Sequence, residues 1–180
     1  MTPKTKALIR EYAESIAIAL VLALVVRTFV VQAFKIPTGS MRPTLLEGDR
    51  ILVNKFIYRF RQPEPGDIVV FKYPEDPKRD FIKRLVATAG QKVEIRSGQI
   101  FVDGKLLHAK GSFEQRYYYN QGVFGKEGEE IAVPRDSFFV LGDNSASSRD
   151  SRYWGFVPKR NLVGKAFFLY WPPHRIRITR

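Results

Sequence analysis

Ser40 is the first residue of this chain that could do covalent chemistry. It lies in the stretch Pro37–Leu45, with Gly39 directly before it and Pro43 three residues after it, just past a long apolar run. We interpret this serine as a nucleophile held close to a membrane. The same residue types also form polar turns and helix N-caps, so this stretch alone leaves both interpretations open.

A serine nucleophile needs a base, because its hydroxyl is barely ionised near neutral pH. The chain has no cysteine, and neither of its two histidines lies in a recognisable catalytic context. Lys83 fits better, since it follows Ile82 in an apolar stretch where strand alternation could turn its side chain inward. Burial lowers the pKa of a lysine, and a neutral amine can accept the serine proton. The alternative is an ordinary surface lysine with Arg84 facing the other way.

A third stretch, residues 142–155, is dense in hydroxyls and opposite charges. It could be a solvated turn whose surface ion pairs contribute little energy. It could also supply a hydroxyl that orients a neutral lysine, and an Asp150–Arg152 pair that stiffens the site.

Together these stretches resemble bacterial type I signal peptidases, the membrane-anchored serine proteases that remove signal peptides from exported proteins. The resemblance runs in the family's order from the apolar segment to Ala166. The matching pieces are Pro37–Leu45, Pro65–Val69, Ile82–Arg84 with Gly90, and the block that runs from Gly142 through Gly155.

The resemblance implies a Ser/Lys dyad, in which Ser40 attacks the scissile carbonyl and Lys83 acts as base and then as acid. It also implies that the oxyanion is held by the Ser40 backbone N–H and the Thr38 hydroxyl. Ser148 matches the family's hydroxyl that orients the lysine, and Asp150 and Arg152 match the pair of residues that supports the site in the family. The chain departs from the family pattern at residue 145, where it has Ser and related sequences often have Arg.

The substrate expected from the resemblance is the signal peptide of a preprotein, cut after a small-x-small motif. An extended substrate would pair with the strands around residues 36–40 and 81–83. The residues that would line shallow apolar pockets are Ile36, Pro37, Met41, Leu45, Phe81 and Ile82.

Composition limits the remaining function classes. The 180 residues, 44% of them hydrophobic, suit one domain plus an appendage. The formal charge of +12 permits an anionic partner, and because no nucleic-acid motif appears we expect lipid headgroups rather than nucleic acid. Without cysteines and with two histidines, the sequence predicts no metal site, and the dyad chemistry needs no cofactor.

Residues 16–34 form an apolar run interrupted by a charge only at Arg27, and as a helix it would measure about 28 Å. We therefore predict a cytoplasmic N-terminus over residues 1–10, a transmembrane helix over 11–34 and an extracytoplasmic catalytic domain over 35–180. This corresponds to a single pass through a bacterial plasma (inner) membrane, with the catalytic domain on its outer side, or through a thylakoid membrane. A cleaved secretory signal peptide and a soluble core helix are the alternatives.

After Asp49 the pattern changes to period two, with β-branched and aromatic residues that are typical of strands. Tight hairpin turns are expected at Ser97-Gly98 and Asp103-Gly104. Residues 105–134 have no clear pattern and are treated as an insertion or loop region. The fold class is therefore mainly β: a barrel-like antiparallel sheet domain with one N-terminal transmembrane helix. The predicted strands cover 50–56, 67–72, 81–87, 92–95, 99–102, 137–141 and 165–170.

Two other functions fit parts of this pattern. One is a membrane-tethered β-domain that binds a partner and cuts nothing, with Ser40 capping a turn. The other is a self-cleaving repressor-type domain with a similar dyad, which the apolar segment and the lack of a DNA-binding helix pair disfavour.

Overall fold

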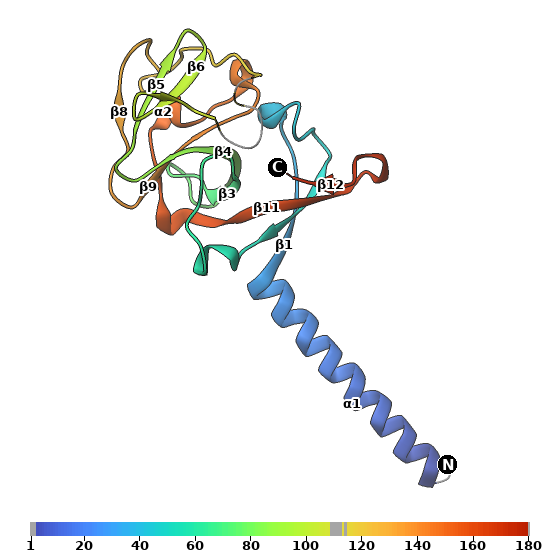
Figure 1. The fold of residues 1–180 in the computed structure, drawn as a ribbon. Coiled ribbons are helices and arrows are strands. Elements are labelled where there is room, and N and C mark those ends of the chain that lie inside the picture. The colour runs from blue at the N-terminus through green and yellow to red at the C-terminus, as the bar shows by residue number, and fades with distance from the viewer. Residues whose placement is uncertain (1–2, 109–112, 114, 180) are drawn as a thin grey trace.

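The computed structural model describes residues 3–108, 113 and 115–179. Helix α1 (Pro3–Val25) extends away from a body built of β-strands, as Figure 1 shows. The chain enters this body through a π-helical turn, η1 (Val26–Val30), and strand β1 (Val31–Lys35).

The larger of two sheets is antiparallel and curved into a half-barrel, in the order β1-β2-β11-β3-β4-β9-β10, with β12 paired to β11. The strand predictions for this sheet are confirmed to within a few residues at each end. After β1, its strands are β2 (Arg50–Asn54), β3 (Ile68–Lys72), β4 (Asp80–Thr88), β9 (Ser137–Leu141), β10 (Val157–Pro158), β11 (Leu162–Trp171) and β12 (Arg177–Ile178).

The smaller sheet has the order β7-β6-β5-β8. Its hairpin turns form where they were predicted: φ is positive at Ser97, Gly98, Asp103 and Gly104, as type I′ turns require. The strands are β5 (Lys92–Arg96), β6 (Gln99–Val102), β7 (Lys105–Leu106) and β8 (Ile131–Ala132).

Short helices connect these strands. The longest is α2 (Ser151–Trp154), and the others are 3-10 turns: η2 (Gly39–Met41), η3 (Ile57–Arg59), η4 (Ser145–Ser147), η5 (Lys159–Asn161) and η6 (Pro173–Arg175).

The observed helix differs at both ends from the range 11–34 that was predicted for a transmembrane helix. The helix begins at Pro3 and its α-helical part ends at Val25, and Val31 already has the extended dihedrals of a strand. The later half of the apolar run is rich in β-branched residues, which favour strands, and β1 pairs along its whole length with β2. Within the described residues, no helix combines the length and apolar character that crossing a membrane requires.

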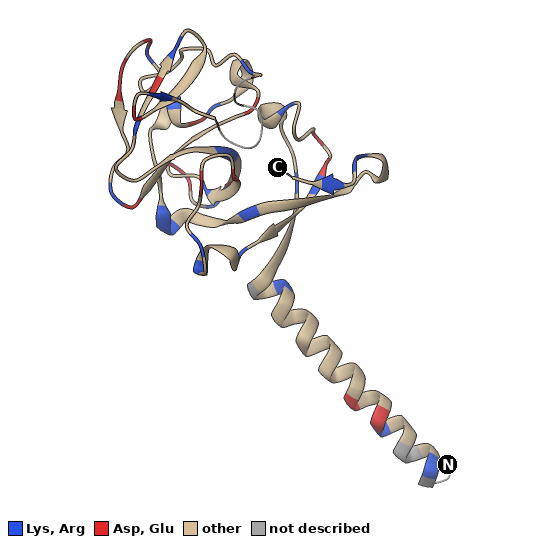
Figure 2. Cartoon of the chain, viewed as in Figure 1, with Lys and Arg blue, Asp and Glu red and all other residues tan. Residues whose placement is uncertain are grey.

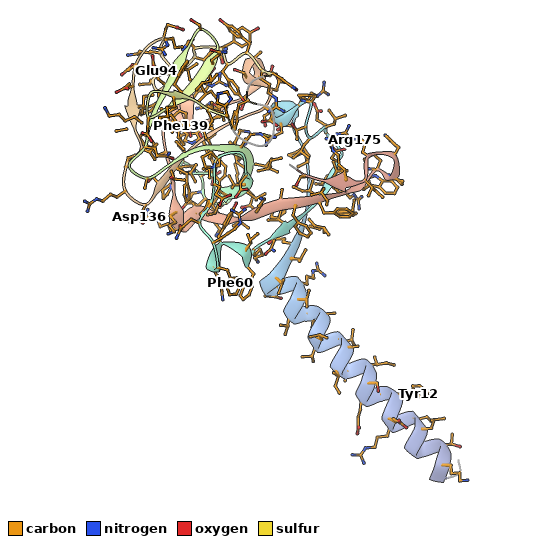
Figure 3. All side chains as sticks on the ribbon, in the orientation of Figure 1. Tyr12, Phe60, Glu94, Asp136, Phe139 and Arg175 are labelled. Carbon is orange, nitrogen blue, oxygen red and sulfur yellow. The ribbon has the colours of Figure 1, made fainter. Side chains whose placement is uncertain are left out.

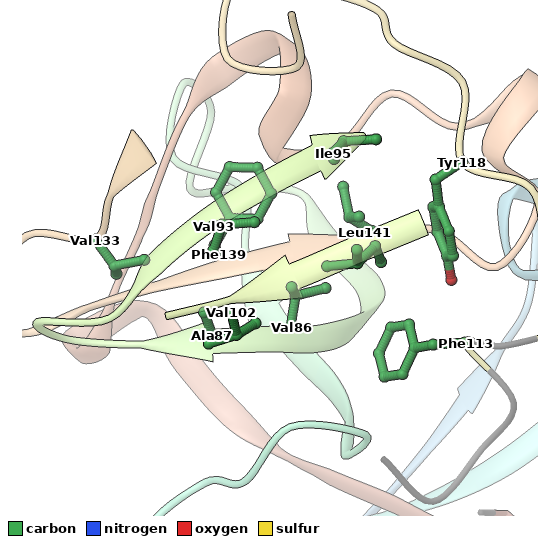
Figure 4. Packing of buried hydrophobic residues seen from close by; sticks show 11 residues of the cluster. Val86, Ala87, Val93, Ile95, Val102, Phe113, Tyr118, Val133, Phe139 and Leu141 are labelled. Carbon is green, nitrogen blue, oxygen red and sulfur yellow. The ribbon is translucent and has the colours of Figure 1, made fainter. Parts of the chain in front are cut away.

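Buried apolar side chains form three clusters. One fills the space between the two sheets, and Figure 4 shows its residues from β5, β6 and β9 facing one another. Phe113 and Tyr118 belong to this cluster, with 4% and 0% of their surface exposed. Part of the 105–134 region is therefore packed core rather than an open loop.

Candidate active site

Ser40 lies in the 3-10 turn η2, directly after the chain leaves β1. Met41 and Leu45, on the same loop, are fully buried and anchor it to the core. Backbone hydrogen bonds on either side of the turn also fix it, since Ile36 N donates to Asp49 O at 2.8 Å and Gly48 N donates to Ile36 O at 2.9 Å. The turn holds the serine side chain 8% exposed at the edge of a cleft.

Lys83 lies on β4, opposite Val69 of β3. Strand alternation turns Lys83 toward Ser40, while Arg84 points to the other face of the strand. The lysine is 4% exposed, and its Nζ lies 2.7 Å from Ser40 Oγ. The structure therefore brings together the two residues that the sequence predicted as nucleophile and base, 43 positions apart in the chain.

Burial lowers the pKa of Lys83 from its ordinary 10.5 to about 8. The carboxylates of Asp150 and Asp143 oppose this shift, and the Arg152 guanidinium adds to it. With a pKa near 8, about one amine in ten is neutral at pH 7, compared with about one in three thousand for a solvated lysine. Such an amine can serve as a base at physiological pH.

The loop after β9 holds the nucleophile turn in place. Asn144 N donates to Ser40 O at 3.0 Å, and Asn144 Nδ2 donates to Gly39 O at 3.1 Å. Gly142 allows this approach, because a Cβ at residue 142 would lie 2.6 Å from Ser40 O and 2.0 Å from Ser148 Oγ. The sequence marked Gly142-Asp143-Asn144 as a motif but assigned Asn144 no role.

Asp150 and Arg152 form a bidentate ion pair, with both side chains fully buried. Asp150 Oδ2 accepts a hydrogen bond from Gly142 N at 3.0 Å, which links the pair to the loop that holds Ser40. Ser145 also belongs to this network, because its Oγ accepts hydrogen bonds from Arg152 Nη1 and Tyr119 N, both at 2.8 Å.

Ser148 is buried beside Gly142, but its Oγ has no hydrogen-bond partner within the described part of the chain. Ser148 Oγ therefore makes no hydrogen bond to Lys83 within the described chain, and the orienting role that the resemblance implies stays a prediction. What remains of that prediction is the location of the hydroxyl, next to the loop that holds Ser40.

A second buried charge network lies behind the site and was not predicted. Arg84 is fully buried and binds Asp143 through two hydrogen bonds of 2.8 and 2.7 Å. Arg116 Nη1 lies 2.8 Å from Asp143 Oδ1, and Arg116 Nη2 donates to Thr44 Oγ1 at 2.9 Å. Thr44 itself donates to Asp143. The network thus ties Arg116 of the 105–134 region to Thr44 of the nucleophile loop, which lies 72 positions earlier in the chain.

The cleft at Ser40 has a volume of about 320 Å³. Of the predicted substrate-binding residues, Pro37, Phe81 and Ile82 line it, together with the predicted oxyanion residue Thr38, whose Oγ1 lies 3.4 Å from Ser40 Oγ. The other three predicted lining residues, Ile36, Met41 and Leu45, are instead buried in the core at 2%, 0% and 0% exposure. Sequence alone could not separate apolar pocket residues from apolar core residues beside the nucleophile.

One edge of β4 is open beside this cleft. Residues 80–84 pair with β3, whereas β9 pairs only with residues 84–88. Among the described strands, none therefore occupies the second edge of Asp80–Lys83. An extended peptide could hydrogen-bond to that edge.

Comparison with known proteins places this chain in a family. The family described as "Signal peptidase, peptidase S26" matches residues 9–171, and the chain belongs to it. It is 39% identical to "Probable signal peptidase I-2" of Synechocystis sp., covering 92% of this chain and 75% of that protein. It is 35% identical to "Signal peptidase I" of Pseudomonas aeruginosa, covering 92% and 74%.

A plant relative is also similar. The chain is 38% identical to "Thylakoidal processing peptidase 1, chloroplastic" of Arabidopsis thaliana over 94% of this chain and 50% of that protein. The predicted resemblance is confirmed, and the chain is a serine peptidase of the signal peptidase family. Neither the partner-binding nor the repressor-type alternative is supported by these matches.

Proposed function

We propose that this chain removes N-terminal signal peptides from exported preproteins, cutting after a small-x-small motif through a Ser/Lys acyl-enzyme mechanism. The observation that carries the proposal is the 2.7 Å distance between Ser40 Oγ and the Nζ of a lysine that is 4% exposed. Family membership supplies the substrate class, and the buried dyad supplies the chemistry.

In the first step the neutral Lys83 amine accepts the Ser40 proton as Oγ attacks the scissile carbonyl carbon. The negative charge that develops on the carbonyl oxygen is stabilised by the Ser40 backbone N–H and the Thr38 hydroxyl. The support for Thr38 is its place in the cleft, with Oγ1 3.4 Å from Ser40 Oγ. The Lys83 ammonium then gives its proton to the leaving amine, which releases the mature protein and leaves an ester on Ser40.

Deacylation repeats the same proton path with water. Lys83, neutral again, takes a proton from a water molecule that attacks the ester carbonyl, and returns it to Ser40 Oγ as the ester breaks. Asn144 and the buried Asp150–Arg152 pair act as positioning residues, because they hold the backbone around the serine rather than touching the reacting atoms.

The preference for small residues follows from the cleft and the open strand edge. A substrate paired with Asp80–Lys83 would point alternate side chains, those one and three places before the cut, to the same face. There they would meet Phe81, Ile82 and Pro37, which leave a cleft of about 320 Å³. Larger side chains at these two places would clash with its walls.

We also propose that the enzyme works at the outer side of a bacterial plasma membrane, with a thylakoid membrane as the alternative. The support is the series of apolar side chains on α1 that no other part of the described chain covers, including Ile18 at 69% and Leu22 at 62% exposure. Contact with lipid would remove this apolar surface from water. Protease protection of the catalytic domain in spheroplasts measures on which side it lies.

The test of the activity is cleavage of a preprotein by the detergent-solubilised chain. We expect cleavage to be lost in both Ser40→Ala and Lys83→Met. Matched controls are Ser147→Ala, an exposed serine of the neighbouring loop, and Lys72→Met, an exposed lysine of the neighbouring strand, which should cleave like the wild type. Full activity in either dyad variant would remove that residue from its assigned role.

A further inference from the structure

A second cavity lies where helix α1 meets the β-sheet body. Its volume is about 610 Å³, and it is bounded by the end of α1, the turn η1, and strands β1 and β2. Leu24 and Leu52 contribute apolar walls, and Thr28 and Gln32 contribute polar groups. None of the residues that line the catalytic cleft takes part in it.

Two cations face this cavity without a compensating acid. Arg27 and Lys55 both line it, and its described lining contains no Asp or Glu. Lys55 is fixed to the turn, because its Nζ donates to Thr28 O at 2.8 Å and its backbone N donates to Val30 O at 2.9 Å. Arg27 is exposed and has no hydrogen-bond or ion-pair partner in the described chain. The cavity thus offers a guanidinium and a held ammonium to an anion.

The position of the cavity indicates which kind of anion would bind there. Figure 2 shows that α1 carries its charges near its start and then none until the basic position at the junction with the body. The exposed apolar side chains of the helix, such as Leu20 and Leu24, end just before Arg27. On the other side of the junction, Phe60 is 77% exposed (Figure 3). The centre of its ring lies 4.8 Å from that of Phe56, which directly follows Lys55 in the sequence. This sequence of apolar surface, cations and exposed aromatic ring is typical of a bilayer's headgroup layer.

We propose that this cavity binds the phosphate of an anionic phospholipid headgroup. The proposal rests on the proposed contact of α1 with lipid. Arg27 presents a planar fork of donors that suits phosphate oxygens, and Lys55 supplies a point charge that is held at Thr28 O, beside Arg27. Leu24 and Leu52 lie where the first acyl carbons of the same lipid would enter. The site would fix how the body stands on the membrane surface and so where the catalytic cleft meets its substrate.

The test is a titration of the full chain in neutral detergent with dihexanoylphosphatidylglycerol, with dihexanoylphosphatidylcholine and with inorganic phosphate. A basic residue near an anionic lipid surface raises the binding affinity by a factor of about five. We therefore expect Arg27→Gln and Lys55→Gln each to weaken phosphatidylglycerol binding about fivefold, and the double variant to weaken it about thirtyfold. The control is Arg135→Gln with Lys105→Gln, an exposed pair of the same charges outside this cavity, which should bind within twofold of wild type.

The outcomes separate this proposal from the catalytic one. Ser40→Ala should bind the lipid like wild type, and the cavity double variant should cleave a soluble peptide like wild type, which also shows that it folds. The proposal is overturned if the double variant binds phosphatidylglycerol as tightly as wild type. It is also overturned if the control pair loses as much affinity as the double variant. Phosphatidylcholine or inorganic phosphate that binds as tightly as phosphatidylglycerol overturns it as well.

Discussion

Lys83→Met should stabilise the fold while it abolishes catalysis. Below pH 8 the folded protein holds a charged amine that is 4% exposed, and burial lowers its pKa from 10.5 to about 8. Each pKa unit corresponds to about 1.4 kcal/mol, so the charged amine costs the fold about 3 kcal/mol at pH 7. Methionine is similar in length and apolar, and it removes this cost without opening a large cavity.

The pH dependence of this gain is specific to a buried amine. The folded-state pKa lies below the unfolded value, so between about pH 8 and 10.5 the unfolded chain binds more protons and the wild type becomes more stable as pH rises. Below pH 8 the cost is fully present, and above 10.5 it disappears. The advantage of the methionine variant should therefore fall from about 3 kcal/mol at pH 7 to about 2 kcal/mol at pH 9.

The assay is urea unfolding of both proteins in the same detergent at pH 6, 7 and 9, with the exposed Lys72→Met as the control. The control should show no pH-dependent difference from wild type in this range. A Lys83→Met variant that is less stable than wild type at pH 7, or whose advantage does not change with pH, would refute a strongly desolvated amine.

The remaining predictions concern catalysis. With a neutral Lys83 as base, kcat/KM should rise about tenfold per pH unit and level off near pH 8, and a profile that is flat from pH 6 to 9 contradicts this role. Thr38→Val should lower kcat by a factor of about 10² to 10³, because the valine removes one oxyanion donor. Thr38→Ser keeps a hydroxyl and should stay near wild type. Equal activity of the valine and serine variants in a peptide assay would show that the hydroxyl does not stabilise the oxyanion. Asn144→Ala should lower kcat about tenfold with little change in KM, because it removes the hydrogen bond that holds Gly39 O beside the nucleophile. An unchanged kcat would show that this hydrogen bond does not position Ser40. A chelator should not change the rate of cleavage, and a loss of cleavage on adding the chelator would contradict a Ser/Lys mechanism.

The strands and hairpins were predictable because they depend on local pattern. Alternation of exposed and buried residues occurs in Arg50–Asn54 and Lys92–Arg96, and the turns form at Ser97-Gly98 and Asp103-Gly104, as the local sequence predicts. The end of α1 was not predictable from hydropathy, because one continuous apolar run forms a helix in its first part and a strand in its last part. The pairing of β1 with β2 decides the change at Val31, and that pairing is a long-range contact.

The dyad itself could be predicted, but its surroundings could not. Ser40 and Lys83 were predicted because the stretches around them resemble the signal peptidase family, whereas their residue types alone left a turn-capping serine and a surface lysine as alternatives. Asn144 was missed because its role is to hold the backbone of Ser40 across the site, and the sequence contains no local signal of that contact. The same holds for Arg116, which reaches Thr44 and Asp143 from a stretch without a clear pattern.

The role of Lys83 is tested most directly by NMR titration of its side-chain amine in the folded, detergent-solubilised wild type, assigned by comparison with Lys83→Met. The account predicts a midpoint near pH 8, well below the ordinary lysine value of 10.5. A midpoint near 10.5 would show that the amine stays charged at the pH of catalysis, and Ser40 would then have no base.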